Sequence, residues 1–147
     1  MMVSIVHASC FCMTSAAKSA HINPERATPI RVLVVEDDQS IRETLGMVLE
    51  SFDYGVSLVD GGETALSQLK QEWPDVMLLD LTLEGMTGEE LYDRIRTQFG
   101  HTPPTVVLSA VPHGENRTKH MEGVQFLAKP YSLEDLNEMI ERVSRAA

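Results

Sequence analysis

Short apolar runs alternate with longer amphipathic segments from Ile30 to the end of the chain, and this alternation strongly constrains the fold. Continuous apolar runs are typical of strands covered on both faces, and strand–helix alternation is typical of a parallel α/β sheet. Because such crossovers are right-handed, the pattern predicts a doubly wound, five-stranded parallel sheet with helices on both faces. The expected strands are 30–35, 56–59, 76–79, 105–108 and 124–127, and the expected helices are 39–51, 62–71, 89–97 and 133–145.

The composition changes at Ile30 and divides the chain into two parts. Residues 1–29 lack periodicity and are rich in small residues, so we expect a poorly ordered N-terminal extension. Residues 30–147 suffice for one domain with a hydrophobic core, and we expect no second domain after the last helix. Within this domain the segment 111–121 is polar and nearly lacks an apolar stripe, so it is the weakest helix candidate.

The charge balance is acidic, with 22 Asp and Glu against 12 Lys and Arg and a net charge of -10. Nucleic-acid phosphates are bound by clustered Lys and Arg, so we expect no direct nucleic-acid partner. No apolar run is long enough to span a bilayer, and no basic region precedes an apolar core at the N-terminus. We therefore expect no membrane partner and a cytoplasmic location.

Two cysteines, Cys10 and Cys12, lie close together near the N-terminus. A disulfide between residues one position apart would require a distorted backbone. A metal site would need more ligands than the nearby His7 and His21 supply. We therefore expect both cysteines to be reduced thiols.

Polar residues follow four of the five expected strands. Because ligands of open parallel sheets bind beyond the carboxyl ends of the strands, we expect these residues to meet at one rim. Each has an ordinary explanation by itself, since acids favour helix N-termini and the other side chains suit turns, caps or the surface. Their occurrence at four strand ends together favours a functional site. They are Glu36, Asp37 and Asp38 after the first strand, Asp80 after the third, Ser109 and Ala110 after the fourth, and Lys129 and Pro130 after the fifth.

The chemistry of this set points to phosphoryl transfer. An ionised carboxylate at the tip of a buried strand, such as Asp80, is costly unless it pairs or binds a cation. Crowded carboxylates repel one another, and Mg²⁺ relieves that repulsion through oxygen ligands. An aspartate can also act as a nucleophile that forms an aspartyl phosphate, while a hydroxyl and a lysine stabilise the transferring oxygens.

At these intervals the residues resemble the response-regulator receiver domains of two-component signalling. The resemblance runs from about Arg31 to the end of the chain and rests on "RVLVVEDDQSIRETL", "PDVMLLDLTLEGMTGEEL", "VVLSA" and "FLAKPYSLEDL". It implies a stand-alone signalling module with strand order 2-1-3-4-5. Asp80 would accept a phosphoryl group from the phosphohistidine of a sensor histidine kinase or a histidine phosphotransfer protein. The resemblance implies Mg²⁺ as cofactor, held by Glu36, Asp37, Asp80 and the main-chain carbonyl of Thr82, with Asp37 in direct contact.

The resemblance also implies a switch. Ser109 would be the switching hydroxyl, Ala110 the small residue that leaves access for phosphate, and Lys129 the phosphate-binding lysine. Phe126 would be the aromatic switch residue, and a cis peptide bond is expected before Pro130. The face formed by the fourth helix, the fifth strand and the fifth helix would bind an unknown protein target, and the protein would be a monomer or a weak homodimer.

Two departures from the family pattern stand out. Glu84 occupies a position where the family usually carries proline, so the loop after Asp80 is expected to be less rigid. The interval from Ser109 to Lys129 is slightly short, which places the fourth helix in doubt.

A phosphatase of the haloacid-dehalogenase type is the main alternative function, because it also uses an aspartate nucleophile with Mg²⁺. Such enzymes need a second aspartate two residues after the nucleophile, and Thr82 occupies that position. We therefore expect no enzyme activity beyond Mg²⁺-dependent self-phosphorylation and slow self-dephosphorylation. A receiver-like protein that never takes phosphate is disfavoured by the presence of Asp80 and Lys129, and a flavodoxin-like cofactor binder is disfavoured by the acidic rim.

Overall fold

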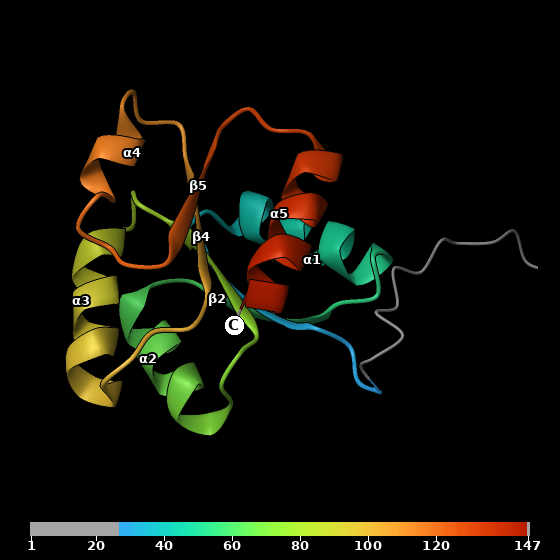
Figure 1. Cartoon of the computed structure of the whole chain (residues 1–147), viewed down its shortest axis with the longest axis horizontal. Helices are drawn as coiled ribbons and strands as arrows, with labels where there is room; N and C mark the ends of the chain where they lie inside the picture. Colours follow the sequence, from blue (N-terminus) through green and yellow to red (C-terminus); the bar gives the residue numbers. More distant parts are fainter. Residues whose placement is uncertain (1–26, 147) are drawn as a thin grey trace, which may run out of the picture.

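The computed structural model describes residues 27–146 and shows five strands alternating with five helices (Figure 1). The strands are all parallel in the order β2-β1-β3-β4-β5, which confirms the predicted doubly wound sheet. The strands are β1 (Arg31–Val35), β2 (Gly55–Val59), β3 (Val76–Asp80), β4 (Thr105–Ser109) and β5 (Val124–Ala128). The helices are α1 (Gln39–Ser51), α2 (Gly62–Gln71), α3 (Gly88–Phe99), α4 (Gly114–Arg117) and α5 (Leu133–Ala146).

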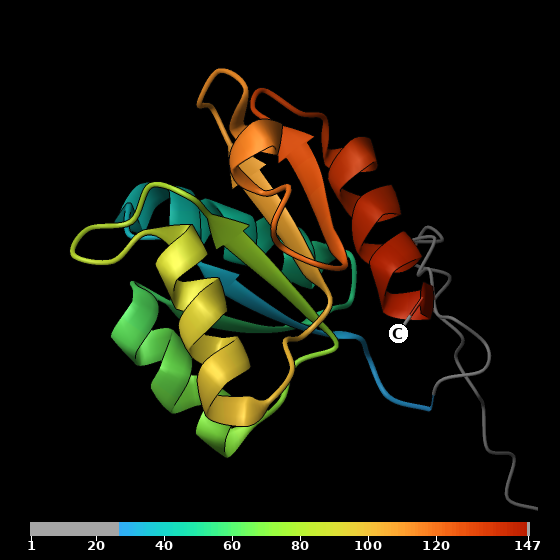
Figure 2. The same cartoon turned by 60° about the vertical axis from the view of Figure 1, so that its left-hand side comes forward.

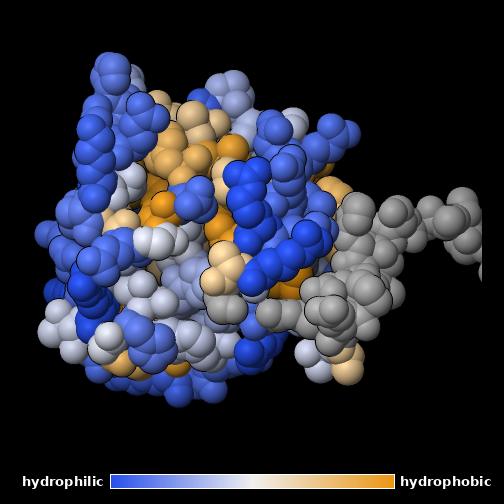
Figure 3. Space-filling model, in the orientation of Figure 1, coloured by the Kyte–Doolittle hydropathy of each residue, from blue (hydrophilic) through white to orange (hydrophobic). Residues whose placement is uncertain are grey.

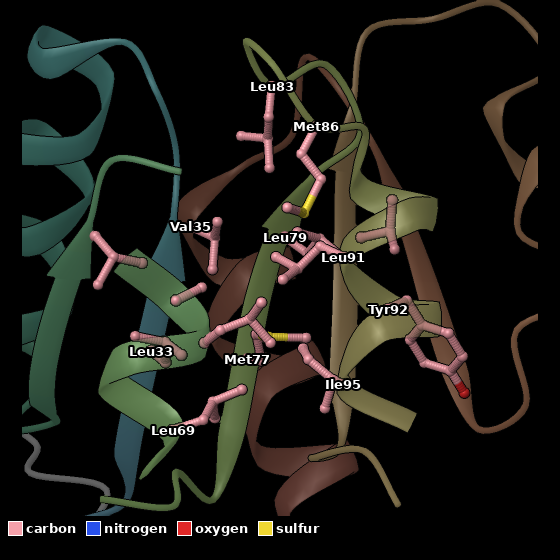
Figure 4. Packing of buried hydrophobic residues seen from close by; sticks show 14 of the residues in the cluster. Leu33, Val35, Leu69, Met77, Leu79, Leu83, Met86, Leu91, Tyr92 and Ile95 are labelled. Carbon is pink, nitrogen blue, oxygen red and sulfur yellow. The ribbon is translucent and has the colours of Figure 1, made fainter. Parts of the chain in front are cut away.

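The helices cover the sheet from both sides, with α2, α3 and α4 on one face and α1 and α5 on the other (Figure 1). Alternate residues of β1 point toward opposite faces of the sheet, as successive side chains of a strand do. Leu33 and Val35 pack with α2 and α3, whereas Val32 and Val34 pack with α1 and α5. Figure 4 shows the first of these two cores. The continuous apolar runs are thus explained by a sheet that is covered on both faces.

Burial differs from one strand to another. Every residue of β3 is buried, including Asp80 at its carboxyl end. By contrast, β5 is an edge strand of the sheet, and none of its residues is fully buried. The residue that carries the expected chemistry therefore stands in the rigid centre of the sheet.

The fourth helix is short, as the polar segment 111–121 suggested, and α4 spans only Gly114–Arg117. Arg117 of α4 forms an ion pair with Glu89 of α3. Gly114 packs closely against the ring of Phe126, since a Cβ built on Gly114 would lie 2.9 Å from its Cε2 atom. These contacts place α4 beside α3 and β5 without a long apolar stripe.

Parts of the sequence predictions concern residues outside 27–146. Most of the expected N-terminal extension, together with Cys10 and Cys12, lies outside the described residues. Within 27–146, no helix combines the length and the apolar character that a membrane crossing requires.

Candidate functional site

The carboxyl ends of the parallel strands lie at one edge of the sheet, from which the loop after β3 projects (Figure 2). Three of the predicted site residues form a compact charged group there. The ammonium Nζ of Lys129 donates a 2.9 Å hydrogen bond to Oδ2 of Asp80 and lies 3.6 Å from Oε2 of Glu36. The structure thus brings together residues from the ends of β1, β3 and β5.

The two acids of this group are buried and Lys129 is partly buried, and this burial changes the proton affinities of Glu36 and Lys129. Glu36 is 3% exposed and Asp80 is 9% exposed. Burial, together with the neighbouring Asp80, raises the pKa of Glu36 to about 7. Burial lowers the pKa of Lys129, but its hydrogen bond to Asp80 and the charges of Asp80 and Glu36 outweigh this effect, so the pKa is raised. Lys129 therefore remains a cation beside the central aspartate.

The acidic segment after β1 is ordered by its own hydrogen bonds. Oε1 of Glu36 accepts a 3.2 Å hydrogen bond from the main-chain N–H of Asp38. The Asp38 carboxylate caps α1 by accepting a 3.0 Å bond from the N–H of Ile41. The guanidinium of Arg42 donates to the carbonyl oxygens of Glu36 and Asp37, at 2.9 and 3.2 Å. One acid is thus a helix cap, while the other two remain for the site.

The loop after β3 contacts both remaining aspartates of the site. The N–H of Thr82 donates a 2.7 Å hydrogen bond to Oδ1 of Asp80. The N–H of Glu84 donates a 3.0 Å bond to Oδ2 of Asp37. Asp80 is therefore held through both of its carboxylate oxygens, by Thr82 on one and by Lys129 on the other.

The loop returns to the sheet at Gly88, where α3 begins. The N–H of Gly88 donates to the carbonyl of Leu81 at 3.1 Å, and a Cβ on Gly88 would lie 2.7 Å from the carbonyl oxygen of Asp80. Only glycine therefore allows α3 to approach the end of β3 this closely.

Replacement of Gly88 by Ala is expected to lower the free energy of unfolding by about 1–3 kcal/mol, because its Cβ would meet main-chain atoms of Asp80 and Leu81. Urea denaturation followed by circular dichroism measures the change. Gly55→Ala is a matched control, because the nearest atom to its Cβ would be 3.8 Å away. Equal stabilities of the two variants would contradict this close approach of α3 to the end of β3.

The remaining predicted residues lie around the end of β4 and β5. Ser109 is buried, and its Oγ accepts a 3.1 Å hydrogen bond from the N–H of Val111. Ala110 is exposed, whereas Phe126 is half-buried. A Cβ on Gly114 would lie 3.5 Å from Oγ of Ser109, so Gly114 adjoins both Ser109 and Phe126. The peptide bond between Lys129 and Pro130 is cis.

Sequence comparison identifies the family. The sequence model of the response regulator receiver domain matches residues 32–141. The chain belongs to the response regulator receiver domain family. It is therefore a signal-transduction module of the two-component type, and such domains are generally not enzymes.

Curated relatives are longer than this receiver domain. The phosphate regulon transcriptional regulatory protein PhoB of Escherichia coli is 33% identical over 118 residues, which are 78% of this chain and 52% of that protein. The response regulator MprA of Mycolicibacterium vanbaalenii is 33% identical over 110 residues, which are 74% of this chain and 47% of that protein. The chain thus spans about half the length of the curated relatives it matches.

Solved receiver structures match the fold. The chemotaxis protein CheY4 of Vibrio cholerae has a TM-score of 0.71 and 28% identity, covering 79% of this chain and 99% of that chain. The receiver domain of the sensor histidine kinase PA1611 of Pseudomonas aeruginosa has a TM-score of 0.70 and 25% identity, covering 80% and 99% of the two chains. That structure has a magnesium ion coordinated in its active site cleft.

Three contributions to the site were missed by the sequence predictions. They are the contacts of Arg42 with the carbonyls after β1, of the Glu84 N–H with Asp37, and of Gly114 with Phe126. The position of Arg42 in the first turns of α1, shortly after the acidic segment, was a usable signal. The two other contacts join residues that are distant in the sequence, and neither has a local signature.

Proposed function

We propose that this receiver domain is a phosphorylation-controlled signalling module in which Asp80 accepts a phosphoryl group from the phosphohistidine of a histidine kinase or a histidine phosphotransfer protein. The observation that carries the proposal is the environment of Asp80. This carboxylate lies at the tip of a buried strand, between the ammonium of Lys129 and the N–H of Thr82, with Glu36 next to it. Such an environment fixes a nucleophile and places positive charge beside it.

In the proposed phosphoryl transfer, one bond to phosphorus forms while another breaks. A carboxylate oxygen of Asp80 attacks phosphorus, the O–P bond forms as the P–N bond of the phosphohistidine breaks, and the bonding pair returns to the ring nitrogen. Lys129 stabilises the negative charge on the phosphoryl oxygens during this step. Ser109, Ala110 and the cis bond at Pro130 are proposed to shape the space that the phosphoryl group occupies.

The residues present fit Mg²⁺. Glu36 and Asp80 are crowded and buried, so a cation would relieve their repulsion. Within residues 27–146 no three acidic, His or Cys side chains are already grouped as a metal cluster. We propose that Glu36, Asp37, Asp80 and the carbonyl of Thr82 hold the ion, with Asp37 in direct contact and water oxygens in the remaining positions. When bound, Mg²⁺ supplies Lewis-acid stabilisation of the transferring phosphoryl group.

The signal is proposed to leave the domain through the face formed by α4, β5 and α5. Figure 3 shows an apolar area between α4 and α5, over β5. Within this face, Phe126 and Leu127 of β5 are half-buried, and Leu133 at the start of α5 is 49% exposed. Phosphorylation would draw Ser109 toward the phosphoryl group and let Phe126 move inward, which would shift the population toward a state that binds a protein target. The acidic composition, with a net charge of -10, argues against nucleic acid as a direct partner.

Rapid phosphatase turnover is not expected. The position two residues after Asp80 is Thr82, whose side chain cannot act as a general acid or base in the way a carboxylate does. Slow self-dephosphorylation by water is therefore the expected limit.

Incubation of the full chain with acetyl phosphate and Mg²⁺ tests the proposal. We expect a single acid-stable, base-labile phosphoryl adduct, and tandem mass spectrometry should place it on the peptide that contains Asp80. Chelation of Mg²⁺ should prevent its formation. Absence of an adduct, or an adduct on a different residue, would overturn the proposed function.

A further inference from the structure

The loop after β3 presents two main-chain N–H groups to the two aspartates of the site. Thr82 donates to Asp80, and Glu84, two residues further on, donates to Oδ2 of Asp37 at 3.0 Å. Asp37 and Glu84 are 47 positions apart in the sequence. The second bond therefore connects the loop after β1 to the loop after β3.

The loop has the means to hold these N–H groups in place. Leu81, Leu83 and Met86 are buried in the core between the sheet and α2 and α3, and Figure 4 shows Leu83 and Met86 directed toward that core. Thr82 and Glu84 alternate with them and are exposed. The apolar anchors on both sides of Glu84 thus fix its main chain, although its side chain is in water.

We propose that the main-chain N–H of Glu84 is a positioning group for the magnesium site, because it orients the carboxylate of Asp37. This inference rests on the proposed function, in which Asp37 binds the ion directly. A carboxylate offers about four lone pairs on two oxygens, so one hydrogen bond to Oδ2 leaves acceptor capacity for a cation. Hydrogen bonds that orient metal ligands typically change metal affinity about 10–100-fold when they are removed.

Glu84→Pro removes the donor, because proline has no N–H. We expect the fold to tolerate proline at this position, because Gly85 has φ +76° and Pro commonly precedes such a glycine in a turn. Glu84→Ala is the matched variant, because it loses the same carboxylate but keeps the N–H. The two variants therefore separate the main-chain bond from the charge of the side chain.

Isothermal titration of each protein with MgCl₂, without any phosphodonor, provides the readout. We expect the dissociation constant to rise about tenfold in Glu84→Pro. In Glu84→Ala we expect a rise of no more than about threefold, because the charge of an exposed side chain is screened. When Asp37→Ala is also present, Glu84→Pro should have no further effect on the affinity. Equal affinities of the Pro and Ala variants, or an undiminished Pro effect without the Asp37 carboxylate, would overturn the inference.

A second measurement does not require proline to be tolerated. In the amide NMR spectrum, Asp37→Ala should shift the Glu84 proton toward the position of a water-bonded amide, and an unchanged shift would overturn the inference. Absence of Mg²⁺ binding by the unaltered protein would also overturn it, together with the metal assignment. The adduct on Asp80 is measured separately, so failure of the Glu84 inference is distinguishable from failure of phosphoryl acceptance.

Discussion

Asp80→Asn is expected to lower the rate of phosphorylation by acetyl phosphate by on the order of a thousandfold or more, because an amide is a poor nucleophile at this position. The substitution keeps the shape of the side chain and an acceptor oxygen for the Thr82 N–H. The fold should therefore survive, and the thermal unfolding curve checks this. Intact-protein mass spectrometry over time measures the fraction of phosphorylated chain.

Asp60→Asn is the matched control for this variant. Asp60 directly follows β2, so it lies at the same edge of the sheet, but it is exposed and accepts a hydrogen bond from the hydroxyl of Thr64. The Asp60→Asn variant loses the same charge but leaves the group of Glu36, Asp80 and Lys129 unchanged. We expect its phosphorylation rate to change by less than about threefold, because exposed charges are screened. A persistent adduct in Asp80→Asn, or an equal loss in Asp60→Asn, would contradict the assignment of the acceptor.

Lys129→Met is expected to lower the phosphorylation rate by about 10²–10³-fold, which is typical for the loss of one positioned donor that stabilises developing negative charge. Methionine retains most of the side-chain length, so packing along β5 should change little. The same substitution should strengthen Mg²⁺ binding, because it removes a cation that lies 2.9 Å from Asp80 and 3.6 Å from Glu36. Slower transfer combined with tighter metal binding distinguishes an electrostatic role from general damage to the fold.

Lys70→Met provides the comparison for the change in net charge, since Lys70 is exposed at the end of α2. Reactions with acetyl phosphate that are quenched at successive times give the phosphorylation rates of both variants. Titration with MgCl₂ gives their affinities for Mg²⁺. A Lys129→Met protein that is phosphorylated as fast as the Lys70→Met protein would contradict the proposed role of Lys129.

Much of the fold could be predicted from periodicity, because apolar runs and stripes report directly on the two buried faces of the sheet. The strand ends were predicted less well. Asp80 pairs in register with Leu108, and Ser109 pairs with Ala128, so β3 and β4 each extend one residue beyond the apolar run, into Asp80 and Ser109. A search for apolar residues ends where the polar residue begins, whereas the ladder of main-chain hydrogen bonds does not depend on side-chain polarity. The length of α4 was also left open, because its segment has no apolar stripe.

The composition of the candidate site could be predicted because parallel strands deliver their carboxyl ends to one edge. The separate roles of the neighbouring acids could not be predicted in this way. Glu36 and Asp38 are similar in chemistry, yet Glu36 is buried beside Lys129 while Asp38 caps α1. The path of the chain after β1 decides which acid is buried at the site and which one caps α1. Contacts such as those of Arg42 with the carbonyls of Glu36 and Asp37 stabilise that path.

The contrast between the fully buried β3 and the half-buried edge strand β5 implies a gradient of local stability across the domain. Amide hydrogens of a central, buried strand exchange with solvent only when a large part of the core opens, whereas an edge strand with a short neighbouring helix opens at a lower free energy. We therefore expect slow exchange at β3, which carries the proposed phosphoryl acceptor Asp80, and faster exchange at β5, which belongs to the proposed target face. On this basis, a change in interaction energy at Asp80 would be expected to redistribute conformations at β5 more readily than at β3 itself.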